Sequence, residues 1–258
     1  MALILIPLPR QGFDPTEAGV PWQALARKGH QVCFATPDGC AARADPRVLT
    51  GAGFGPWRSL LRADRNGRAA HDAMVADAGF RTPLTHAEAA SRSFDGLILP
   101  GGHAPGMREY LESDVLQRIV VRAFEQDIPV GAICHGVVLA ARSRGADGRS
   151  VLHGRKTTAL TRTLELSAWA LTALWLGNYY RTYPQTVEAE VTRALAQPCD
   201  FERGPLALRR DDERHPERGF TVRDGNYLSA RWPGDAHRFA TEFLELLDAT
   251  RAAEDLPA

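Results

Sequence analysis

Cys134 is the residue whose surroundings point most directly to chemistry. An apolar run of β-type residues, 128–133, ends at this cysteine, and a histidine and a glycine precede a helix-type run. A strand that turns sharply into a helix presents the side chain of its turn residue, with the positive end of the helix behind it. That end lowers the pKa of a thiol. Ala132 and Gly136 supply the small flanks of such a turn. We therefore expect a nucleophile here, although a buried structural cysteine would also fit the run.

Glu17 and His135 are candidate partners of this thiol. Asp14, Pro15 and Glu17 occupy the N-cap, N1 and N3 positions of an expected helix, close to the pattern of a capping box. The turn before that helix lies at the carboxyl edge of a parallel sheet, where the elbow also lies. Glu17 could therefore move protons beside the thiol or only cap its helix. His135, as the immediate neighbour of Cys134, would ordinarily be structural or a cation that tunes the thiolate.

Two glycines directly after another apolar strand could supply half of an oxyanion hole. Gly101 and Gly102 would let backbone N–H groups approach a ligand, and the N–H of His135 would be the second donor. A tight turn would also use these glycines. The loop matches neither a phosphate-binding loop nor a dinucleotide fingerprint, because the residues that these motifs require are missing.

The elements that must position these residues alternate between strands and helices, which predicts an α/β fold. Strand, helix and strand are expected at 2–8, 15–28 and 30–36, a crossover that is normally right-handed. Residues 38–93 break the alternation and are interpreted as a cap insertion. Strands at 94–100, 128–133 and 156–160, helices at 114–126, 164–175 and 236–252, and a hairpin around 224–226 complete the prediction.

Composition narrows the classes of function. The chain has 258 residues and zero formal net charge, so nothing indicates a nucleic-acid or membrane partner. Its four cysteines form no CxxC pair, so no metal site of the usual spacing is expected. With only two lysines, Lys28 and Lys156, Schiff-base chemistry is disfavoured. No signal peptide is visible, and a reducing cytoplasm fits best.

Three motifs together resemble the ThiJ/PfpI superfamily: residues 14–17, the loop 100–106 and the elbow 132–136. This superfamily has the class I glutamine amidotransferase-like fold. The resemblance implies one domain over 1–258, with a flavodoxin-like, mostly parallel sheet between helices. Residues 38–93 look like the cap of its glyoxalase III and heat-shock-chaperone branch. The superfamily also makes a homodimer the first expectation.

The resemblance implies Cys134 as nucleophile, His135 as its histidine, Glu17 as the acid facing the thiol, and Glu165 as third member of a triad. Some members use an aspartate slightly earlier, where this chain has threonines at 161 and 163. The implied reaction is glutathione-independent conversion of methylglyoxal-type 2-oxoaldehydes to 2-hydroxy acids, which needs no cofactor. A different cysteine-dependent hydrolase, hydratase or amidase, and a stress chaperone or redox sensor, are the alternatives. A glutamine amidotransferase is disfavoured.

Overall fold

The computed structural model describes residues 1–207 and 209–254 and confirms the α/β fold. Its main sheet has the strand order β5-β3-β1-β6-β7-β9-β8. Every neighbouring pair is parallel except β8 and β9, which form the predicted hairpin. The strand bounds are β1 Leu3–Pro7, β3 Gln31–Thr36, β5 Leu84–Thr85, β6 Gly96–Leu99, β7 Val130–Ile133, β8 Thr221–Asp224 and β9 Tyr227–Ala230. Two short strands, β2 (Gln11–Phe13) and β4 (Arg43–Ala44), pair separately.

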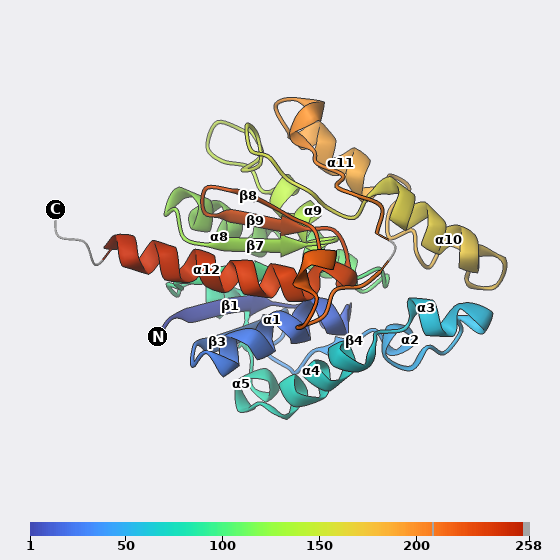
Figure 1. The fold of residues 1–258 in the computed structure, drawn as a ribbon. Helices are drawn as coiled ribbons and strands as arrows, with labels where there is room; N and C mark the ends of the chain where they lie inside the picture. Colours follow the sequence, from blue (N-terminus) through green and yellow to red (C-terminus); the bar gives the residue numbers. More distant parts are fainter. Residues whose placement is uncertain (208, 255–258) are drawn as a thin grey trace.

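Helices cover both faces of the sheet. Figure 1 shows α1 and α12 in front of the strands, where they contact each other, and α8 and α9 behind. Central strands buried on both faces carry near-continuous apolar runs, as β1 and β6 do. The helix bounds are α1 Pro15–Arg27, α2 Pro46–Thr50, α3 Arg58–Leu61, α4 Arg65–Ala76, α5 Ala78–Arg81, α6 His86–Ala90, α7 Met107–Leu111, α8 Asp114–Glu125, α9 Gly136–Arg142, α10 Arg162–Leu176, α11 Val187–Ala194 and α12 Ala236–Glu254.

A second apolar cluster lies beyond the carboxyl ends of the strands. Val48, Phe54 and Ala63 pack there with Tyr180 and with partly buried residues of α10. In Figure 1, α2, α3 and α10 occupy this side of the molecule. The covering layer therefore combines part of the insertion at 38–93 with a segment from the second half of the chain, while β5, also inside the insertion, belongs to the main sheet.

The prediction of a strand at 156–160 is wrong. Thr157 makes one isolated bridge, to Phe201, and its hydroxyl bonds the Tyr227 hydroxyl at 2.9 Å. The Thr158 N–H donates to the Ser229 hydroxyl at 2.9 Å instead of to a backbone carbonyl. Side chains of β9 thus take the place that a neighbouring strand would fill. Among the described residues, no helix has the length and apolarity to cross a membrane.

Candidate active site

The elbow forms as the sequence predicts. Cys134 follows β7, precedes α9, and has a left-handed backbone with φ +57. Its N–H donates to the Ala230 carbonyl of β9 at 3.0 Å. A Cβ added at Gly136 would lie 1.9 Å from the Leu99 carbonyl oxygen, so this close approach requires glycine. The backbone of Cys134 is strained, because a non-glycine residue is held in the left-handed conformation. Such strain is common at functional sites.

Glu17 faces the elbow and does not cap its own helix. The Asp14 carboxylate caps α1 by accepting from the N–H groups of Thr16 at 2.8 Å and Glu17 at 3.2 Å. Glu17 Oε2 instead accepts from the Gly101 N–H at 2.8 Å. A Cβ on Gly101 would lie 2.7 Å from that oxygen and 2.9 Å from the Cβ of Cys134. Glu17 Oε1 is buried with no partner among the described residues, so it is available to a reacting group.

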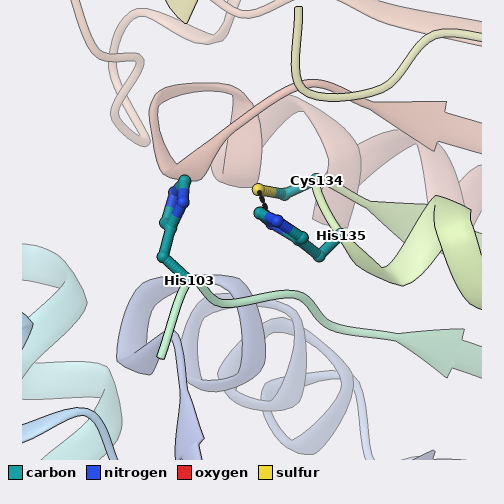
Figure 2. A group of neighbouring side chains, drawn as sticks. All are labelled: His103, Cys134 and His135. Atoms are coloured by element: carbon teal, nitrogen blue, oxygen red, sulfur yellow. Dashed lines mark hydrogen bonds between the residues drawn. The ribbon is translucent and has the colours of Figure 1, made fainter. Parts of the chain in front are cut away.

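Two histidines stand beside the thiol. His135 Nδ1 lies 3.5 Å from Cys134 Sγ, so the ring turns toward its own neighbour in the chain. His103 follows β6, and its ring centroid lies 4.8 Å from that of His135 (Figure 2). Sequence reasoning missed His103. The available signal was its position directly after Gly102, at the sheet edge where the elbow also lies.

Burial keeps these groups neutral. It raises the pKa of Glu17 well above its usual range, and the Asp14 charge adds to this effect. It lowers the pKa of His103 to about 4 and that of His135 well below its usual range. Burial also raises the pKa of the Cys134 thiol, which the Glu17 charge would raise further, although the His135 N–H lowers it. The expectation that the helix start yields a resting thiolate is therefore wrong, because desolvation outweighs it.

The two N–H groups expected to bind an oxyanion belong to Gly102 and His135. Neither donates to another backbone group among the turn and loop hydrogen bonds of the described residues. The Gly101 carbonyl instead accepts from the Asp14 N–H at 2.8 Å, which fixes the loop against the start of α1. No backbone acceptor among the described residues therefore occupies these two donors.

Glu165 is buried on α10 but does not reach His135 as a hydrogen-bond partner. Its Oε2 accepts from the Val187 N–H at 2.9 Å, at the start of α11, and its Oε1 lies 3.4 Å from Arg181 Nε. Among the described residues, the His135 ring has one hydrogen-bond partner, the sulfur of Cys134. In this arrangement Glu165 joins α10 to α11, and no acid orients the histidine.

Glu165→Gln is accordingly expected to leave kcat near the wild-type value and to change stability in a pH-dependent way. Burial raises the pKa of Glu165 from 4.5 to about 7. The folded state therefore holds the proton more tightly, and its stability falls as pH rises from about 4.5 through 7. Glutamine does not ionise and lacks this penalty. The free energy of unfolding of the variant, relative to that of the wild type, should therefore rise between pH 5 and pH 8 by up to roughly 3 kcal/mol. Denaturant titrations at both pH values test this; a large loss of kcat would restore Glu165 to the triad.

His103, Cys134 and His135 are also the group that could hold a metal. Their ligand atoms all lie within 4.8 Å of one another. One sulfur and two imidazole nitrogens are donors that suit zinc or copper. The sequence predicted no metal because it lacks the usual spacing, and here the ligands come together through the sheet edge. A metal at this position would occupy the thiol.

Comparison with known proteins places this site in a family. Residues 8–196 match the sequence profile described as ThiJ/PfpI family-like. Deglycase PfpI of Pyrococcus furiosus is 27% identical over 235 residues, which cover 91% of this chain and 93% of that protein. An uncharacterized protein of Schizosaccharomyces pombe is 31% identical over 144 residues; the match covers 55% of this chain and only 51% of that protein.

Solved structures show the same fold. Glyoxalase III of Candida albicans superposes with a TM-score of 0.64 at 18% identity, covering 95% of this chain and 96% of that one. Drosophila melanogaster DJ-1beta gives a TM-score of 0.55 at 15% identity, covering 99% of this chain and 98% of that one. The elbow, the strand order and the profile match over most of the sequence agree, and the chain belongs to the ThiJ/PfpI family.

Proposed function

We propose that this protein is a cysteine-dependent enzyme that converts 2-oxoaldehydes such as methylglyoxal to 2-hydroxy acids without glutathione. The observation that carries the proposal is the buried cluster of Cys134, His135 and Glu17 at the elbow, with the Sγ–Nδ1 distance at 3.5 Å. Burial favours the neutral form of each group. Such a cluster combines a nucleophile, a group that can accept its proton and an acid that holds a proton at neutral pH.

In this proposal the Cys134 thiol attacks the aldehyde carbon while His135 Nδ1 accepts the thiol proton. Protonated Glu17 gives its proton to the aldehyde oxygen, which forms a neutral hemithioacetal. The Glu17 carboxylate then removes the hydrogen of that carbon as a proton, while the proton held by His135 moves to the oxygen of the neighbouring carbon, which gives an enediol. Glu17 returns its proton to the neighbouring carbon as His135 takes the proton from the first oxygen. The product is a thioester, which water hydrolyses to the 2-hydroxy acid and the free thiol. One carbon is oxidised and its neighbour reduced, so no external oxidant or reductant is consumed.

Backbone donors would stabilise the charge that develops during these steps. The N–H groups of Gly102 and His135 belong to the two loops that meet at the thiol. Donors fixed before the reaction need no reorganisation, and removal of one typically costs about 10²-fold or more in kcat. The glycine loop and the elbow together would therefore provide both the nucleophile and the oxyanion site.

A deglycase is the second candidate, because relatives are named deglycases and the match to PfpI covers 91% of this chain. The two activities can share a first attack by the thiol on a carbonyl carbon. One comparison separates them: D-lactate formation from methylglyoxal without glutathione, and release of free amine from the adduct of methylglyoxal with N-acetyl-lysine. D-lactate that forms promptly from methylglyoxal, at a rate that added amine does not increase, would support the conversion of the free 2-oxoaldehyde over the deglycase activity.

A homodimer is also proposed, with the end of α10 as part of its interface. Leu174 is 94% exposed and Trp175 is 45% exposed, an unusual pair for the surface of a monomer. Aromatic and apolar side chains are enriched at the centre of interfaces. Light scattering at micromolar concentration should give a mass near twice 28.2 kDa, and Leu174→Arg should reduce it. A monomeric mass for the wild type across that range would contradict the dimer.

A further inference from the structure

A cavity of about 540 Å³ lies against the active site. Asp14 and His103 form its inner end, and the covering layer described above supplies half of its lining residues. This volume falls within the range of about 300–1,000 Å³ that is typical of pockets for drug-sized ligands. Methylglyoxal, with five heavy atoms, would leave most of it unfilled. The walls are largely apolar, with side chains that include Leu60, Leu61, Leu164, Ala168, Leu171 and Trp232.

Three arginines line this cavity, and Arg210 is the half-buried one, since Arg209 and Arg218 are exposed. Its Nη2 donates to the carbonyls of Leu60 at 3.3 Å and Arg62 at 3.4 Å, and the guanidinium lies 5.3 Å from the centre of the Trp232 ring. Among the described residues, Nε and Nη1 of Arg210 have no hydrogen-bond partner, and no carboxylate lies within ion-pair distance. Burial raises the pKa values of Asp14 and Glu17, and the positive charge of Arg210 offsets part of this rise, so the guanidinium acts on the catalytic end of the cavity.

His103 separates this cavity from the thiol. It lines the cavity and packs against Tyr180 on one side and His135 on the other, with ring centroids 4.8 Å apart in both cases. Cys134 is fully covered, and Figure 2 shows its sulfur pointing toward the side on which His103 stands. The Nδ1 atom of His103 is buried without a partner in the part of the chain that the structure describes. A ligand that fills the cavity would therefore meet His103 before it meets the sulfur.

We propose that this enzyme acts on 2-oxoaldehydes with a bulky apolar substituent, aryl or branched alkyl, and that Arg210 binds the carboxylate of the 2-hydroxy acid product. This inference rests on the proposed function, since the reaction defines the product. The substituent occupies the apolar part of the cavity, and the carboxylate faces Arg210, the half-buried one of the three arginines that line it. Nε and Nη1 of this guanidinium have no partner among the described residues, so they can donate to a carboxylate, which matches the guanidinium in geometry as well as in charge.

The test measures binding of products, without turnover. Aryl-substituted glyoxals would be poor probes, because they modify arginine side chains. Calorimetry compares lactate, 3-phenyllactate and the neutral amide of 3-phenyllactate. We expect 3-phenyllactate to bind the wild type at least about tenfold more tightly than lactate, since its ring buries apolar area that a methyl group lacks. Equal affinities for the two acids would overturn the proposal.

Arg210→Gln is expected to weaken 3-phenyllactate binding by about tenfold or more and to leave binding of the amide nearly unchanged. An arginine that only supports the fold would affect both ligands alike, and that outcome would remove Arg210 from the proposal. The matched control is Arg162→Gln, which removes an exposed arginine that does not line the cavity. It should leave all three affinities unchanged.

The outcomes also separate this inference from the proposed reaction. Turnover of methylglyoxal together with equal binding of lactate and 3-phenyllactate would contradict the substrate class alone. Selective, Arg210-dependent binding of 3-phenyllactate in a protein that forms no D-lactate would contradict the reaction alone and support the cavity as a site for apolar carboxylic acids.

Discussion

Cys134→Ala is expected to abolish the conversion of methylglyoxal, with kcat at least about 10³-fold lower than in the wild type. The sulfur is the nucleophile of the proposed reaction, and a methyl group cannot form the hemithioacetal. The fold should survive, because the side chain is fully buried among apolar neighbours and alanine can occupy its position without a new clash. Enzymatic detection of D-lactate measures the loss, and thermal unfolding checks the fold.

Cys33→Ala is the matched control for this substitution. Cys33 is a free, half-buried thiol on β3, away from the elbow. Its removal should leave kcat at the wild-type value. Substantial activity in a folded Cys134→Ala protein would mean that the reaction does not pass through a thiol adduct, and the proposed function would have to be abandoned.

Glu17→Gln is expected to lower kcat by about 10²–10⁴-fold while the protein remains folded. The amide oxygen can still accept the Gly101 N–H that now bonds Oε2. It cannot give a proton to the aldehyde oxygen or carry one between carbon atoms. The fold should be as stable or more stable, because glutamine removes a buried carboxyl group whose pKa is raised by desolvation.

Glu88→Gln provides the comparison for a glutamate that only caps a helix. Glu88 completes a capping box on α6, where its Oε2 accepts from the Thr85 N–H at 2.7 Å. It lies at the same position in its helix as Glu17 does in α1, and glutamine also serves there. Activity should not change. If Glu17→Gln behaved like Glu88→Gln, Glu17 would be assigned to structure and not to proton transfer.

The sequence predicts those parts of this protein that depend on local signals. The apolar run before Cys134, the glycine after His135 and the N-cap at Asp14 each determine nearby backbone, and the elbow and α1 form as expected. The direction of the Glu17 side chain could not be predicted in the same way. A glutamate at N3 fits both roles, that of a helix cap and that of a partner of the thiol. Only the contact of Glu17 with Gly101, far along the chain, distinguishes the two roles.

Contacts between distant segments explain the errors as well. The pKa of the thiol was expected to be low because a helix begins behind it, but the complete burial of the thiol depends on loops that no local pattern describes. Likewise His103 becomes part of the site only because β6 and β7 are neighbours. The strand predicted at 156–160 failed because side chains of β9 already satisfy that backbone.

The covering layer has a consequence for the order in which the chain is assembled during synthesis. Its two halves, around Phe54 and Tyr180, meet with ring centroids 5.9 Å apart but are far apart in the chain. At ribosomal rates of about 5–20 residues per second, the first half waits on the order of ten seconds for the second. During that interval Val48 and Phe54 have no partner from α10, so a nascent chain exposes this apolar surface until late. Chaperones that bind exposed apolar segments would have their longest access to the protein at this stage.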